Sequence, residues 1–374
     1  MTKINAIITG VAGYVPDYVL NNEELSRMVD TNDEWITTRT GIKERRILTE
    51  EGLGTSYMAR KAAKLLMKKT GADPDSIDAV IVATTTPDYP HPSTASIVLG
   101  KLGLKNAFAF DFAAACCGFM YAFDVACNMI QSGRHKRIIV IGADKMSSIT
   151  DYRDRATCPL FGDGAGAVMV EGTEEEGIGL IDSYHRTDGK GLPFLHVKAG
   201  GSVCPSSRFT VDHRLHYTYQ EGRTVFRYAV TAMGDDCAAL LERNGLTQND
   251  VDYVVCHQAN LRIIEAVAKR IGVPMEKVLK LCDVHAALFE GKVSCAPTGA
   301  VEETPGHPVW TMRQENDRIL AFIHDRVAPD VKRARTLTES SSNEECAGVA
   351  AILKADMDAF DEVFVHYKRK EELL

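Results

Sequence analysis

The stretch AFAFDFAAACCGFM, residues 107–120, holds the central feature of the chain. Its first six residues are an apolar run that predicts a buried strand, and residues 118–131 have the length and apolar face of a helix. Cys116 therefore lies where a strand ends and a helix begins. The free N–H groups and the dipole of a helix N-terminus favour the thiolate form of such a cysteine, which would make it a nucleophile. The alternative is that Cys116 and Cys117 are small buried core residues.

The composition limits the classes of protein to which the chain can belong. It has 374 residues, 45% of them hydrophobic, which allows a large core in one or two domains. The net charge of −8 argues against broad binding of nucleic acid or anionic membranes. No apolar run approaches the ~18 residues of a membrane span, and the N-terminal run is too short for a secretory signal. The ten cysteines show no zinc-ligand spacing, so we expect free thiols, no metal and a cytoplasmic location.

Strand-like and helix-like segments alternate along the first half of the chain. Apolar runs at 5–10, 79–83 and 137–142 predict strands, and residues 21–28, 31–38 and 55–70 predict helices. This alternation predicts a parallel sheet covered by helices on both faces. The glycine-rich residues 161–167, FGDGAGA, lack a Walker lysine and therefore indicate close backbone packing rather than phosphate binding.

The chain also contains a long-range repeat. Residues 64–83, KLLMKKTGADPDSIDAVIVA, align without a gap with residues 238–257, AALLERNGLTQNDVDYVVCH. A helix, a turn and a strand are thus used twice, which indicates duplication of a whole α/β half. His257 ends the second copy, so we expect it at the C-terminal end of a strand, the edge where open α/β sheets carry their sites. Two halves packed around a pseudo-two-fold axis would bring His257 and Cys116 into one cleft. A structural histidine is the alternative.

Trp35 lies four residues before Arg39. An exposed indole beside a guanidinium could stack on an adenine and hold a phosphate. A tryptophan packed beneath the aliphatic stem of an arginine is the simpler structural interpretation.

Four segments resemble the family of beta-ketoacyl-(acyl-carrier-protein) synthase III, condensing enzymes of the thiolase-like superfamily. They are TNDEWITTRTGIKERR (31–46), AAACCGF (113–119), DRATCPLFGDGAGA (154–167) and HQANLRII (257–264). The resemblance covers residues 1 to about 279. It implies an α/β fold of two duplicated halves with a layered α-β-α-β-α architecture. The corresponding boundaries are 1–172 for the half with the nucleophile, 173–280 for the half with the histidine, and 281–374 for a divergent tail.

The resemblance also implies a role for each matching residue. Cys116 matches the acyl-accepting nucleophile, Cys117 fills a place usually held by a small residue, and His257 matches the catalytic histidine. His91 falls where the family shapes the acyl pocket across a dimer. Residues that match coenzyme A (CoA) contacts are Trp35, Arg39, Arg155 and Asn260. Residues that match the docking surface for acyl carrier protein (ACP) are Arg262, Lys269 and Arg270.

The family chemistry then gives an expected reaction. An acyl-CoA donor loads Cys116, malonyl-ACP loses CO2, and His257 stabilises the enolate that attacks the acyl group. The resemblance implies a homodimer and requires no metal, nicotinamide or redox cofactor. Two alternatives stay open: an acyltransferase that makes no carbon–carbon bond, and a non-catalytic binding partner of ACP or of a true synthase.

The tail departs from the family pattern. The segment G-N-T-S-A, which carries the third catalytic residue, is absent, and Ala287 stands near the place of its asparagine. His285 is a nearby candidate substitute. Residues 345–360 predict a helix and 363–367 a short strand, after a flexible connector, ESSSNEE. A genuine replacement, a relative without decarboxylation, or a frameshift or join in the source sequence would each explain this ending.

Overall fold

The structure is a computed structural model that describes residues 4–279. All of these belong to the first of its two units, Met1–Pro297. The predictions for residues 280–374, including those for His285, Ala287 and the tail elements, lie outside the described residues.

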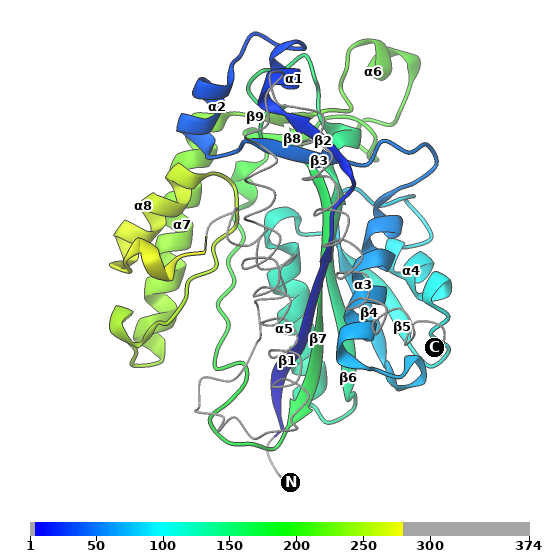
Figure 1. The fold of residues 1–374 in the computed structure, drawn as a ribbon, viewed down its shortest axis with the longest axis vertical. Coiled ribbons are helices and arrows are strands. Elements are labelled where there is room, and N and C mark those ends of the chain that lie inside the picture. Colours follow the sequence, from blue (N-terminus) through cyan, green and yellow to red (C-terminus); the bar gives the residue numbers. More distant parts are fainter. Residues whose placement is uncertain (1–3, 280–374) are drawn as a thin grey trace, which may run out of the picture. The chain divides into compact units, whose positions relative to one another are not determined.

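The main element of the described part is a five-stranded sheet with the order β1-β7-β6-β4-β5 (Figure 1). Strand β4 pairs in parallel with β5 and β6, whereas β7 pairs antiparallel with β6 and β1. The prediction of a parallel sheet is therefore wrong for β7. The link from β6 to β7 contains only the short turn η3 (Met146–Ile149) and no crossover helix, so the chain returns antiparallel. The strands are β1 (Asn5–Tyr14), β4 (Ala79–Ala83), β5 (Phe108–Phe112), β6 (Arg137–Lys145) and β7 (Asp163–Thr173).

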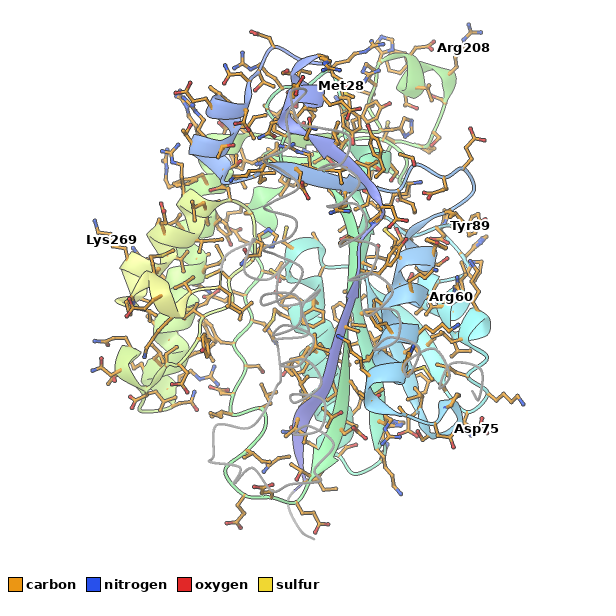
Figure 2. The ribbon with its side chains drawn as sticks, in the orientation of Figure 1. Met28, Arg60, Asp75, Tyr89, Arg208 and Lys269 are labelled. Atoms are coloured by element: carbon orange, nitrogen blue, oxygen red, sulfur yellow. The ribbon has the colours of Figure 1, made fainter. Side chains whose placement is uncertain are left out.

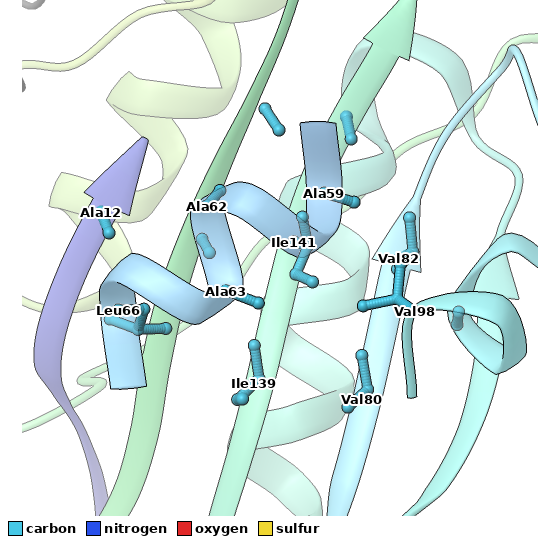
Figure 3. Packing of buried hydrophobic residues seen from close by; sticks show 14 of the residues in the cluster. Ala12, Ala59, Ala62, Ala63, Leu66, Val80, Val82, Val98, Ile139 and Ile141 are labelled. Carbon is cyan, nitrogen blue, oxygen red and sulfur yellow. The ribbon is translucent and has the colours of Figure 1, made fainter. Parts of the chain in front are cut away.

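Strand β4 forms the centre of the core, and its sequence AVIVA is buried throughout. Its side chains alternate between the two faces of the sheet. Val80 and Val82 join Leu66 of α3 (Thr55–Thr70) in one apolar cluster, which Figure 3 shows together with Val98 of α4 (Thr94–Leu102). Ile81 belongs to the cluster on the opposite face, which is covered by α5 (Gly118–Gln131). Helices on both faces are thus confirmed, and they fix the C-terminal edge from which the site is built.

A smaller layer carries the first family segment. The antiparallel strand pair β2 (Tyr18–Asn21) and β3 (Glu44–Ile47) packs with α1 (Asn22–Ser26) and α2 (Asp33–Thr40), which connect the two strands along the chain. Arg45 is buried at its base, where its guanidinium donates to Pro159 O at 2.9 Å and to Asn22 Oδ1 at 2.7 Å. These bonds compensate part of the cost of burying the charge. The layer therefore holds α2 in a fixed position.

The second copy of the repeat reproduces the local structure of the first. Gly71 and Gly245 both have φ of 65° after their helices, and a short 3-10 turn follows each at the same offset, Pro74–Ser76 and Gln248–Asp250. Strand β4 then pairs on both sides, whereas the matching residues of the second copy make one parallel bridge, Val254 to Val278. The predicted boundary at 172/173 falls at the end of β7 and stays a prediction.

The remaining elements of the described part follow β7. They are β8 (Leu195–Val197), α6 (Arg208–Asp212), β9 (Thr218–Gln220), α7 (Gly222–Arg243) and α8 (Leu261–Ile271). No helix within residues 4–279 is long and apolar enough to cross a membrane.

Candidate active site

Cys116 lies at the junction that the sequence predicts. It belongs to the 3-10 turn η2 (Ala115–Cys117), between the C-terminal end of β5 and the start of α5. We name residues 115–117 the nucleophile turn. Ala115 has φ of 46°, a left-handed conformation that non-glycine residues rarely adopt. Such backbone strain concentrates at functional sites, where the surrounding structure holds it in place.

Gly118 allows this turn to lie close to the sheet. A Cβ atom at position 118 would meet Ala83 Cβ of β4 at 3.3 Å, which is tighter than nearly all real contacts. A larger residue would push the start of α5 away from the strand ends. The small residue that follows the two cysteines therefore allows the turn, and with it the sulfur of Cys116, to lie close to the strand ends.

The two cysteines of the turn are accessible, whereas Cys127 and Cys158 are buried. The core interpretation of Cys116 and Cys117 is therefore wrong. The predicted preference for thiolate is also not met, because the pKa of Cys116 is raised. Enclosure of the sulfur by protein is the largest cause, and the charges of Cys117 and Asp144 add to it. A backbone hydrogen bond lowers the pKa as expected of a helix start, but it is the weakest of these effects.

A cavity opens beside the nucleophile turn. Its volume is about 680 Å³, and it lies at the C-terminal ends of β4 and β5, lined by Thr84, Tyr89, Ser93, Asp111 and Ala115 among others. Nearby, Asp144 Oδ1 accepts hydrogen bonds from the hydroxyl groups of Thr84, Thr85 and Thr86 at 3.0–3.1 Å. Cys116 directly follows Ala115, which lines this cavity, so a cavity of this size is placed to hold a small acyl group beside the nucleophile turn.

His257 follows the short parallel bridge of the second copy. Val254 N donates to Lys277 O at 2.8 Å, and Leu279 N donates to Val254 O at 3.0 Å. His257 comes three residues after this bridge, at the C-terminal end of the extended segment. Burial lowers its pKa, so the imidazole is neutral at neutral pH and can donate one N–H.

Residues of α7 act on the neighbours of both candidate residues. Burial is the largest cause of the raised pKa of Cys117 and of Cys256, the neighbour of His257, and the charges of Asp236 and Cys237, respectively, raise these pKa values further. Residues 236–237 therefore lie within electrostatic reach of the nucleophile turn and of the segment that ends at His257. No hydrogen bond joins Cys116 to His257 within residues 4–279.

Trp35, Arg39 and Arg155 lie together. The guanidinium carbon of Arg39 is 4.7 Å from the centre of the Trp35 ring, and that of Arg155 is 5.3 Å from it. Asp30 holds Arg155 through an ion pair of 3.2 Å. Trp35 also packs against the apolar cluster of the small layer formed by β2, β3, α1 and α2. The structural interpretation and the ring-stacking interpretation of Trp35 thus both have support.

The predicted contacts on α8 differ in their surroundings. Asn260 caps the helix, its side chain accepting from Ile263 N at 2.9 Å, so its oxygen is used locally. Arg270 is occupied by an ion pair with Asp235 at 2.5 Å, whereas Lys269 points outward from α8 (Figure 2). Arg262 lines a groove of about 650 Å³ along α7.

Sequence reasoning missed two arginines of this groove. Arg223 and Arg227 lie four residues apart on α7 and line it together with Arg262 and the apolar Phe226. Residues four apart share one face of a helix, so this spacing was a signal that could have been used. Three arginines lining one groove give it a positive charge, which favours an anionic ligand. Within residues 4–279 no group of three or more potential metal ligands occurs.

Comparisons with known proteins agree with this geometry. The sequence model for 3-oxoacyl-[acyl-carrier-protein (ACP)] synthase III matches residues 110–189, and the model for its C-terminal part matches residues 241–304. A beta-ketoacyl-ACP synthase III of Phocaeicola vulgatus is 71% identical over 279 residues, which are 75% of this chain and 83% of the relative. One of Porphyromonas gingivalis is 55% identical over 279 residues, with the same two shares.

A solved structure is similar as well. The 3-oxoacyl-ACP synthase III of Aquifex aeolicus has a TM-score of 0.68 and 40% identity, covering 77% of this chain and 92% of its own. The C-terminal match runs past Leu279 to residue 304, whereas the two relatives align over 279 residues.

Proposed function

Because the chain belongs to the beta-ketoacyl-ACP synthase III family and has its thiolase-like α/β fold, we propose that it uses Cys116 and His257 to start fatty acid synthesis. It is an acyltransferase that condenses an acyl-CoA primer with malonyl-ACP. The observation that carries the assignment of Cys116 is the strained nucleophile turn beside an open cavity. Relatives at 55–71% identity bear the name of the condensing enzyme, so neither a non-condensing acyltransferase nor a binding protein is favoured.

The residues divide the reaction into two steps. In the first, the sulfur of Cys116 attacks the thioester carbonyl, and the thiol proton leaves with the CoA thiolate. In the second, malonyl-ACP releases CO2, and negative charge develops on its thioester oxygen. The neutral His257 donates its N–H to that oxygen, and the carbanion attacks the acyl group and expels Cys116. The product is a 3-ketoacyl-ACP, and the expelled Cys116 thiolate takes up a proton from solvent to restore the thiol.

Incubation of the full chain with radiolabelled acetyl-CoA and malonyl-ACP tests the proposal. We expect labelled 3-ketoacyl-ACP, and label on the Cys116 peptide when malonyl-ACP is left out. A chain that binds ACP but takes no label on Cys116 would be a binding protein instead. Label on Cys116 without any condensed product would indicate the non-condensing acyltransferase.

Binding of the CoA nucleotide is assigned to Trp35, Arg39 and Arg155. Arg39→Ala and Arg155→Ala should each lower acyl transfer from acetyl-CoA by about tenfold. This is the usual effect of losing one cation–π or phosphate contact that is partly shielded from solvent. Acyl transfer from a short thioester without the nucleotide should stay unchanged, because the lost binding energy is remote from the reacting carbonyl. Arg60→Ala, on the outer side of α3, serves as the control. Equal losses with both donors would mean that the two arginines are structural.

ACP is proposed to dock on the arginine-lined groove of α7 and α8, through Arg262 and the neighbouring Lys269. Its acidic surface would meet the cations of Arg223, Arg227 and Arg262 around the groove.

The seven cysteines within the described part of the chain are free thiols, which supports a reducing, cytoplasmic location.

A homodimer is proposed to form at strand β5. This strand is an edge of the sheet, its Phe108 is 45% exposed, and the rings of Phe108 and Phe110 stack at 6.3 Å. An open edge with apolar side chains invites pairing with a second copy. Light scattering should give twice the chain mass, and Phe108→Asp should shift the protein towards the monomer. A monomeric wild-type protein at micromolar concentration would contradict the proposal.

A further inference from the structure

Arg214 has an unusual backbone conformation for its residue type. It lies two residues after α6 with φ of 55°, in the left-handed region that non-glycine residues rarely adopt. Two backbone hydrogen bonds hold this turn, since Arg214 N donates to Val211 O at 2.9 Å and Leu215 N donates to Thr210 O at 3.0 Å. Such conformations persist where the surrounding structure fixes them, often at functional sites. The turn therefore fixes the point from which the Arg214 side chain leaves the backbone.

The guanidinium of Arg214 binds the carboxylate of Asp151 in a bidentate ion pair. Its Nε donates to Oδ2 at 3.0 Å, and its Nη2 donates to Oδ1. Two such hydrogen bonds fix the orientation of both groups as well as their separation. The side chains of Arg214 and Asp151 are 33% and 18% exposed, so solvent screens this pair less than it screens a fully exposed one. The guanidinium carbon also lies 4.7 Å from the centre of the Tyr217 ring, a cation–π contact that restricts it further.

Asp151 is the first residue of a compact turn that carries Arg155. We name residues 151–158 the Arg155 turn. The carboxylate of Asp151 accepts a hydrogen bond from Arg153 N at 2.9 Å, and its carbonyl oxygen accepts one from Asp154 N, also at 2.9 Å. These two bonds close the turn around the residues directly before Arg155. The position of the Asp151 carboxylate is thus linked to the backbone at Arg155 by a short chain of hydrogen bonds.

The side chain of Arg155 has little else to fix it. Its ion-pair partner Asp30 has a side chain that is 98% exposed, and the Arg155 side chain is itself 49% exposed. Exposed ion pairs contribute little, because solvent and salt screen them. The place of Arg155 over the Trp35 ring, at 5.3 Å, therefore depends on the backbone of the Arg155 turn. Arg214 binds this turn from a segment that lies 63 residues further along the chain than Asp151.

We propose that Arg214 is a positioning residue for the CoA donor, because its ion pair with Asp151 holds the Arg155 turn and so keeps Arg155 over the Trp35 ring. It acts through Asp151 rather than through a contact of its own with the nucleotide. The proposal rests on the proposed function for the role of Arg155 in CoA binding, whereas the contact between Arg155 and Trp35 can be measured without any substrate.

Acrylamide quenching of Trp35 fluorescence measures that contact. Trp310→Phe leaves Trp35 as the only tryptophan of the full chain, and all variants are made in this background. Arg155 covers part of the indole ring, so Arg155→Ala should raise the quenching constant, and Arg214→Ala should raise it towards the same value. Arg208→Ala is the matched control and should leave it unchanged, because Arg208 of α6 is 95% exposed at the surface (Figure 2).

Arg214→Gly separates the role of the side chain from that of the strained backbone. Glycine adopts φ of 55° readily, so this variant loses the guanidinium but retains the turn after α6. It should raise the quenching constant as much as Arg214→Ala does, and it covers the case that Arg214→Ala does not fold. Asp151→Asn removes the charge of the partner at nearly the same shape and should change quenching in the same direction. Wild-type quenching in both Arg214→Gly and Asp151→Asn would overturn the proposal.

Single-turnover loading of Cys116 shows whether the CoA donor depends on this positioning. Arg214→Gly should raise the acetyl-CoA concentration for half-maximal rate by about three- to tenfold, up to the effect of losing one cation–π or phosphate contact, with the maximal rate unchanged. Loading from a short thioester without the nucleotide should not change. In an Arg155→Ala background, Arg214→Gly should add no further loss. A merely structural role would lower the maximal rate with both donors and add to the loss in Arg155→Ala, which would overturn the proposal.

The two assays distinguish a failure of this proposal from a failure of the proposed function. Raised quenching with unchanged use of acetyl-CoA, in both Arg214→Gly and Arg155→Ala, would contradict the role of Arg155 in CoA binding and leave the positioning by Arg214 standing. Weaker use of acetyl-CoA in Arg155→Ala, with Arg214→Gly like the wild type in both assays, would overturn the positioning and leave the proposed function standing.

Discussion

Cys116→Ser should abolish acyl loading from acetyl-CoA, whereas Cys117→Ser should retain most of it. Cys116 is the thiol at the motif position of the nucleophile, directly after the left-handed Ala115 and beside the cavity. A serine hydroxyl is ionised far less than a thiol at neutral pH. The loss should reach several orders of magnitude, up to about 10⁶-fold, as when a hydrolase loses its nucleophile. The loss is measured as the acyl label on the peptide that contains residues 113–131, identified by mass spectrometry.

The adjacent cysteine is the matched control, because it shares the exposure of Cys116 and the same turn. Loading that survives in Cys116→Ser and vanishes in Cys117→Ser would show that the motif register is displaced by one residue. Equal, partial losses in both variants would mean that the turn tolerates either nucleophile.

His257→Ala should slow condensation by about 100- to 1000-fold, the usual cost of removing one oxyanion donor. Acylation of Cys116 should remain, because the imidazole acts on the malonyl thioester and not on the first step. Burial lowers the pKa of His257, so the neutral donor is present at neutral pH. Because the pKa of His257 is lowered, any loss of wild-type CO2 release that comes from its protonation should begin only below the ordinary histidine pKa of about 6.5.

Labelled CO2 from malonyl-ACP and acyl label on Cys116 are measured side by side for this variant. His213→Ala, an exposed histidine that contacts Phe209 near α6, is the control and should leave both readings unchanged. Loss of both acylation and CO2 release in His257→Ala would indicate a folding defect rather than a lost donor.

Much of the first half could be predicted because its signals are local. The helix at 55–70 and the strand at 79–83 have the predicted bounds, since an amphipathic helix and a fully apolar run leave little choice. Strand β7 was missed, because its glycine-rich start was interpreted only as close backbone packing, and its reversed direction was missed with it. That direction depends on the length and content of the connection from β6.

The junction of strand and helix at Cys116 could be predicted from the sequence, but the charge state of its thiol could not. Motif order placed Cys116 and His257, and helix spacing placed Arg39 near Trp35, whose ring Arg39 and Arg155 both contact. The raised pKa of Cys116 was not foreseen, because it depends on how protein atoms enclose the sulfur, which a sequence pattern does not contain.

The left-handed backbone at Ala115 has a consequence for how this sequence can change. An alanine in this conformation costs about 1–2 kcal/mol, which a glycine would not pay. Selection for heat resistance alone would therefore favour glycine at position 115. The same substitution would make the turn more flexible, so the direction of the Cys116 sulfur would no longer be fixed. Thermal stability and a fixed direction of the Cys116 sulfur would then oppose each other at this residue.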